Sequence, residues 1–80
     1  MSQRKDLINE ILDQGKRSWN AQTDAGGETD VFLTQTVMPL RKLERDGLFS
    51  QLDEHRGNDN GRPVIDKVFI VGEVNRDFES

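Results

Sequence analysis

The 80-residue chain contains no cysteine and no long apolar segment. Without cysteine it can form neither a disulfide framework nor a thiolate metal site. Its longest apolar run, from Val68 to Val71, is far shorter than the roughly 20 apolar residues that span a bilayer. The polar and charged residues that follow Met1 also differ from the apolar centre of a secretory signal peptide. We therefore expect a cytoplasmic domain with no membrane partner.

Histidine is almost as scarce, and the patterns that most catalytic and metal sites need are missing. His55 is the only histidine, so a zinc site would have to be built almost entirely from carboxylates. A single histidine also gives little basis for a nucleophile, a base and an orienting group acting together. No glycine-rich phosphate loop of a standard pattern occurs. The sequence therefore predicts a binding protein with no metal, no cofactor and no enzymatic activity.

Length and composition indicate one small folded domain over residues 1–80. A chain of this size buries only about 60–65% of the surface that its unfolded form exposes, so its core is thin. Apolar residues make up 32% of the chain, but their clustering indicates a folded middle with polar ends. The net charge of −4 opposes non-specific attraction to nucleic-acid phosphates. Any surface that binds nucleic acid must therefore be a local basic patch.

Apolar spacing predicts a first amphipathic helix from Gln3 to Gln14, which Gly15 can end. Residues 16–29 are expected to form a flexible loop, because Gly26-Gly27 stands between polar residues. Within this loop, Trp19 is expected to cover the small core from the side.

Proline and glycine divide the middle of the chain. Thr29 or Asp30 can cap an element that starts at Val31, and Pro39 is expected to separate that element from the next, because proline is poorly tolerated inside a helix. The next element is a predicted helix from Val37 to Asp46, which Gly47 ends.

The C-terminal third is expected to form a hairpin. Asn60-Gly61 is a strong hairpin-turn signal, and residues 63–74 are rich in β-branched side chains, which favour a strand. The charged tail, residues 75–80, is expected to fray.

The predicted helix from Val37 to Asp46 presents a cationic stripe. Its inward side carries Val37, Leu40 and Leu43. The opposite side carries residues at spacings i, i+3, i+4 and i+7, which line up on one helix face. These residues are Met38, Arg41, Lys42 and Arg45. The stripe is the only compact basic element in the chain.

The segment Leu40 to Phe49, Leu-Arg-Lys-Leu-Glu-Arg-Asp-Gly-Leu-Phe, resembles the end of the recognition helix in bacterial winged helix-turn-helix regulators. The resemblance implies an α+β fold with an N-terminal helix, a short helix near Asp30 to Gln35, a recognition helix and a two-stranded wing. It implies a DNA-binding transcriptional regulator. The implied DNA-contacting residues are Met38, Arg41, Lys42 and Arg45 on the helix, with Arg56 and Arg62 on the wing. It also implies a homodimer, which the strand Val64 to Val74 could help to form.

Two alternatives remain open. The acidic charge balance, which includes Asp53, Glu54, Asp59 and Asp66 in the wing, also suits an accessory or inhibitory module that binds a protein partner and no DNA. The second alternative concerns the fold. Val31 to Val37 also alternates like a strand, and a helix from Pro39 to Glu54 would follow it, giving an α-β-α-β domain. That helix would contain Gly47 at a cost of about 1 kcal/mol relative to alanine.

Overall fold

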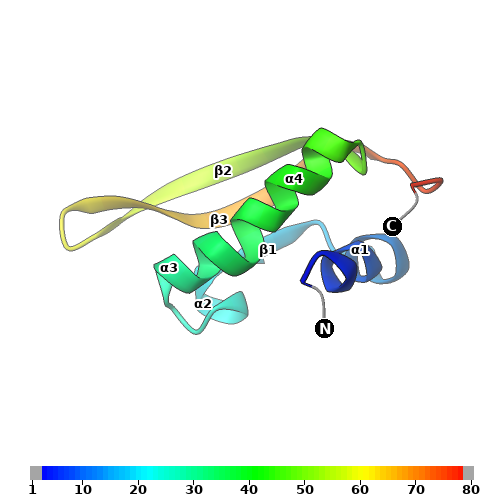
Figure 1. The fold of residues 1–80 in the computed structure, drawn as a ribbon. Helices are drawn as coiled ribbons and strands as arrows, with labels where there is room; N and C mark the ends of the chain where they lie inside the picture. The colour runs from blue at the N-terminus through cyan, green and yellow to red at the C-terminus, as the bar shows by residue number, and fades with distance from the viewer. Residues whose placement is uncertain (1–2, 79–80) are drawn as a thin grey trace.

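The computed structural model describes residues 3–78, whose helices pack on one face of a three-stranded antiparallel sheet (Figure 1). The sheet has the strand order β1-β3-β2. In chain order the elements are α1 (Gln3–Gln14), β1 (Ser18–Asn20), α2 (Ala21–Asp24), α3 (Thr29–Phe32), the π-helical turn η1 (Leu33–Val37), α4 (Met38–Asp46), β2 (Phe49–Asp59) and β3 (Arg62–Val74). This arrangement confirms the predicted α+β class and the C-terminal hairpin.

The first helix has the predicted bounds. Its buried residues Leu7, Ile8 and Ile11 form one stripe at helical spacing. Gly15 then takes a left-handed conformation with φ 68°, which glycine adopts without steric cost.

The segment 16–29 differs from the predicted loop, because it contains β1 and α2. Strand β1 pairs with β3, with Trp19 opposite Val68. Helix α2 begins after Asn20, whose side chain accepts a hydrogen bond from the Thr23 amide at 2.8 Å. Local composition suggested a loop, but the long strand β3 offers a partner that lies far away in the sequence. Residues 25–28, with Gly26 and Gly27 at positive φ, form an irregular turn, and residues 16–17 connect α1 to β1 without regular structure.

Residues 29–46 form one uninterrupted helical segment, so the prediction that Pro39 separates two elements is wrong. The segment includes η1, in which the Met38 amide donates to the carbonyl of Leu33, five residues earlier. In a regular α-helix the proline ring would press on the carbonyl of residue 35. The wider π turn relieves this contact. The alternative strand at Val31 to Val37 is excluded, and the short helix expected near Asp30 to Gln35 is part of this longer helix.

Helix α4 ends at Gly47, as predicted. Gly47 has φ 98°, and its amide donates to the carbonyls of Leu43 and Glu44 at 3.1 Å. Strand β2 starts at Phe49, which excludes the alternative helix through Glu54.

Strands β2 and β3 form a long hairpin whose far end projects beyond the helices (Figure 1). Its turn has Asn60 at φ 53° and Gly61 at φ 84°, the left-handed pair that a type I′ turn requires. The Asn58 side chain accepts a hydrogen bond from the Gly61 amide at 2.7 Å. His55 lies within β2 and contacts Asp66 at 2.7 Å. No residue from 55 to 67 is buried, so this outer half adds little to the core.

The core lies between the long helical segment and the inner part of the sheet. Its largest fully buried side chains are Trp19, Phe32, Leu40, Leu43, Leu48, Val37 and Val68. The tail was expected to fray, but residues 75–78 contact the body of the domain. Asn75 donates its amide to the Leu48 carbonyl at 2.7 Å, and Phe78 packs partly buried against the core. Residues 79–80 lie outside the described range.

Candidate nucleic-acid interface

The predicted cationic stripe lies on the solvent-facing side of α4. Met38, Arg41, Lys42 and Arg45 are all exposed, whereas Leu40 and Leu43 between them are buried. Met38 exposes 47% of its surface, a large fraction for a long apolar side chain. Because residues three and four apart share a helix face, the four exposed side chains form one surface.

The two predicted wing arginines lie beside the start of the long helical segment. Arg56 on β2 and Arg62 on β3 line a groove of about 290 Å³ that Asp30 and Leu33 close from the helix side. The groove floor includes Pro63, Val64 and Ile65. The groove therefore holds the two hairpin arginines, whereas the cations of α4 lie outside it.

Glu54 of β2 connects the hairpin to α4. Its carboxylate forms an ion pair with Arg41 of α4 and lies 3.6 Å from the guanidinium of Arg56. The Glu54 side chain is only 13% exposed, whereas those of Arg41 and Arg56 are 49% and 70% exposed. Two guanidinium groups on one carboxylate leave one excess positive charge, and both arginines can still reach solvent.

The acidic neighbours of the stripe are already paired. Asp46 binds Arg4 of α1 at 2.8 Å, and Glu44 accepts the Leu52 amide at 2.7 Å. Among residues 3–78, neither Lys42 nor Arg45 forms an ion pair. These two cations are therefore the ones best able to bind an external anion.

Sequence reasoning missed the part of this surface that precedes Pro39. Because the helix begins at Thr29, the exposed residues Thr34 and Gln35 are neighbours of Met38 on the helix surface, whereas the exposed Leu33 lies on the side of the hairpin groove. Helical spacing alone would have found them: Thr34 and Gln35 stand four and three residues before Met38. The assumption that proline ends the helix concealed this relation.

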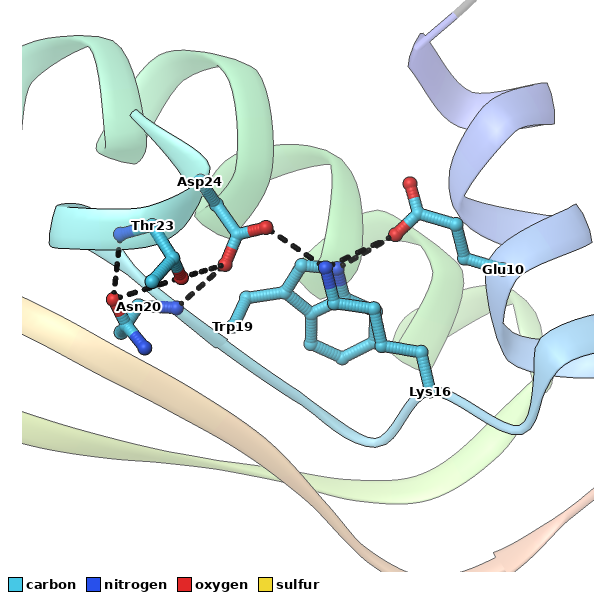
Figure 2. Close-up of polar contacts among 6 residues, drawn as sticks. All are labelled: Glu10, Lys16, Trp19, Asn20, Thr23 and Asp24. Atoms are coloured by element: carbon cyan, nitrogen blue, oxygen red, sulfur yellow. Dashed lines mark hydrogen bonds and ion pairs between the residues drawn. The ribbon is translucent and has the colours of Figure 1, made fainter. Parts of the chain in front are cut away.

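A polar cluster fixes the short helix α2 against the body of the domain (Figure 2). Lys16 contacts Asp24 at 2.8 Å and Glu10 at 3.4 Å, and its ammonium lies 5.5 Å from the Trp19 ring centre. The Trp19 indole donates to Glu10 at 3.2 Å. Asp24 also accepts the Asn20 amide at 2.9 Å. The cluster thus connects α1, β1 and α2.

The same cluster shifts two pKa values. Partial burial disfavours the charged form of Asp24, but the hydrogen bonds from Lys16 and Asn20 outweigh it and hold the pKa below its ordinary value of 3.8. Partial burial likewise opposes the charge of Lys16, but its hydrogen bond and attraction to Asp24 raise its pKa above 10.5. Both groups are therefore charged at neutral pH and stabilise this corner of the fold.

Residues 3–78 contain no group of three or more histidine, aspartate and glutamate side chains that could hold a metal ion. Within the same range, no helix has the length and apolar character needed to cross a membrane. Comparison of the chain with protein-family models, with curated proteins and with solved structures gave no match.

Proposed function

We propose that this chain is a small winged-helix DNA-binding protein that acts as a transcriptional regulator. In this proposal α2, the turn at residues 25–28 and the long helical segment form the helix-turn-helix, and the β2–β3 hairpin forms the wing. The element order, with a first helix, a short helix, a long helix and a hairpin, supports this assignment. The short helix is α2, one element earlier than the sequence suggested.

One observation carries the proposal: the exposed face of α4 gathers Arg41, Lys42 and Arg45 on one surface of a chain that is acidic as a whole. A helix of this kind fits the major groove, which is about 12 Å wide. In this proposal, the exposed Arg56 and Arg62 of the adjoining hairpin contact the phosphate backbone beside the major groove. The acidic remainder limits attraction to DNA in other orientations.

The test is the affinity for a labelled DNA duplex, measured by fluorescence anisotropy at several salt concentrations. We expect Lys42→Ala with Arg45→Ala to weaken binding and to make the slope of log K against log salt less negative by about 2, since each phosphate contact contributes about 0.9. These two cations are chosen because neither is ion-paired within residues 3–78.

The matched control removes two cations elsewhere. Lys5 of α1 and Lys67 of β3 are exposed, and Lys5→Ala with Lys67→Ala changes the net charge by the same amount. We expect the control to keep most of the affinity and the slope. Equal losses in the two double variants would contradict a DNA surface on α4.

The net charge of −4 and the acidic residues of the hairpin favour a second candidate function, an accessory module that binds a protein. If the wild-type chain binds no duplex even at low salt, and a partner with a basic surface is recovered with it, this candidate replaces the first.

The expected homodimer is part of the DNA proposal, because paired half-sites call for two copies. Sedimentation equilibrium with and without duplex measures it.

A further inference from the structure

The exposed face of the long helical segment changes chemical character along its length. Its C-terminal part carries Arg41, Lys42 and Arg45, whereas the part around η1 carries the uncharged residues Thr34 and Gln35. Cations attract the phosphates of any DNA sequence, but discrimination between bases needs hydrogen-bonding and apolar groups at the base edges. The uncharged part therefore suits base reading.

We propose that Gln35, with Thr34 and Met38 beside it, reads an adenine and a neighbouring thymine in the major groove. This inference rests on the proposed DNA-binding function and names the sequence class that the site selects. Thr34 stands four residues and Gln35 three residues before Met38, so each is a neighbour of Met38 on the helix surface.

The Gln35 side chain is free to make such a contact. It is exposed, and within residues 3–78 its carboxamide takes part in no hydrogen bond, whereas the neighbouring Thr34 hydroxyl bonds the Asp30 carbonyl at 3.0 Å. A carboxamide presents an acceptor and a donor side by side. Adenine presents the complementary pair, the N6 amino donor and the N7 acceptor, whereas guanine presents two acceptors at the same edge.

Thr34 and Met38 supply the apolar groups for the proposed thymine contact. Both line a groove of about 280 Å³ next to the start of α1. The Thr34 hydroxyl donates its proton within the helix, so its methyl group is the main surface that it offers to a partner. The C5-methyl of thymine is the apolar group that the major groove displays.

The location of these residues at η1 supports the same assignment. Single π-helical turns occur frequently at functional sites. Here the wider turn carries Thr34 and Gln35 and directly precedes Met38.

The experiment first selects preferred duplexes from a random pool with the wild-type protein. Affinities are then compared between a selected duplex and the same duplex with 7-deazaadenine, which lacks the N7 acceptor, at each adenine in turn. For the wild type, we expect one position to cost about tenfold or more in affinity. For Gln35→Ala, replacing the adenine at that position by 7-deazaadenine should not lower the affinity. The control variant Gln51→Ala, which removes an exposed glutamine from β2, should behave as the wild type.

A second variant tests the role of Gln35 through a change of preference. Gln35→Glu offers only acceptors, so its selected duplexes should carry a cytosine, whose N4 amino group donates, where the wild type selects adenine. A purely structural role would not produce this exchange. If Gln35→Ala keeps the full 7-deazaadenine penalty, or Gln35→Glu selects the wild-type sequence, the inference is wrong while DNA binding stands. Failure of the wild type to bind any duplex overturns the proposed function itself.

Discussion

At the residue scale, two carboxylates hold cations with different consequences. Asp24 binds Lys16 inside the polar cluster that connects α1, β1 and α2. Glu54 binds Arg41 and Arg56 at the surface proposed to meet DNA. The first interaction connects elements of the fold. In the proposed complex, the second would compete with phosphate for the same guanidinium groups, so its removal should change binding as well as stability.

Replacing Asp24 by asparagine should make the stability of the domain less dependent on acid pH. The folded pKa of Asp24 is lowered, so its contribution is present above its unfolded value of about 3.8 and is lost as the pH falls through the folded pKa. We expect Asp24→Asn to lower the free energy of unfolding by about 1 kcal/mol at pH 7. The difference from the wild type should shrink below pH 3.8. Urea unfolding at pH 7 and at acid pH measures both values, and a constant difference would contradict the role of the carboxylate.

Replacing Glu54 by glutamine should strengthen DNA binding. The substitution releases Arg41 and Arg56 from their shared carboxylate and removes one negative charge from the proposed interface. We expect a several-fold higher affinity and a salt slope more negative by about 1. Asp53→Asn is the matched control, because it removes the same charge at the adjacent strand position, whose side chain points to the other face of the sheet. An equal gain in affinity for both variants would show that the gain arises from the change in net charge alone.

At the element scale, the elements that were predicted well depend on local signals. The periodic apolar residues of α1, the left-handed Gly47 and the Asn60-Gly61 turn each act within a few residues. Strand β1 was missed because it exists through pairing with β3, whose sequence lies about 50 residues later. The continuity of the long helix was missed because a π turn, which leaves no clear mark in sequence, accommodates Pro39.

The candidate site likewise has features that follow from local sequence and features that depend on tertiary packing. Helical spacing correctly predicted which residues of α4 are exposed on one face, since that depends only on the helix. These residues are Met38, Arg41, Lys42 and Arg45. The ion pair to Glu54 and the groove beside Arg62 depend on how the hairpin packs against the helix. Such tertiary contacts could not be derived from the local pattern.

Replacing Pro39 by alanine should convert the π turn toward a regular α-helix. Alanine restores an amide donor and removes the ring that would crowd the carbonyl of Gln35 in a regular α-helix. We expect the free energy of unfolding to rise by about 1 kcal/mol, because the gain exceeds the added freedom of the unfolded chain. Pro63→Ala in the exposed part of β3 is the control and should give no such gain. Urea unfolding measures both variants, and a destabilised Pro39→Ala would show that the proline fits the π turn better than alanine does.

At the scale of the whole molecule, the domain consists of a folded body and a projecting arm (Figure 1). Buried residues come from the helices, β1 and the inner parts of β2 and β3, whereas residues 55–67 contribute none. The arm nevertheless carries Arg56 and Arg62. Stability and the proposed binding should therefore be separable by changing the length of the arm.

Deleting residues 57–58 together with 63–64 should leave the body folded and weaken DNA binding. The two deletions remove paired positions in equal number, so the turn and the alternation of side chains are kept. We expect the free energy of unfolding to change by less than about 1 kcal/mol, because no buried side chain is lost. Affinity for duplex should fall, since Arg62 leaves the groove beside Leu33. A large loss of stability would show that the outer hairpin belongs to the folding core.

The buried indole of Trp19 also gives the protein a built-in optical reporter. The chain has one tryptophan and no tyrosine, so its ultraviolet fluorescence arises almost entirely from a single ring. Trp19 is 2% exposed, and the immediate polar contacts of its ring are Glu10 and Lys16, away from the helix face proposed to meet DNA. Its emission should therefore follow unfolding of the body, while the anisotropy of a labelled duplex follows binding, and both signals can be recorded from the unmodified protein in one sample.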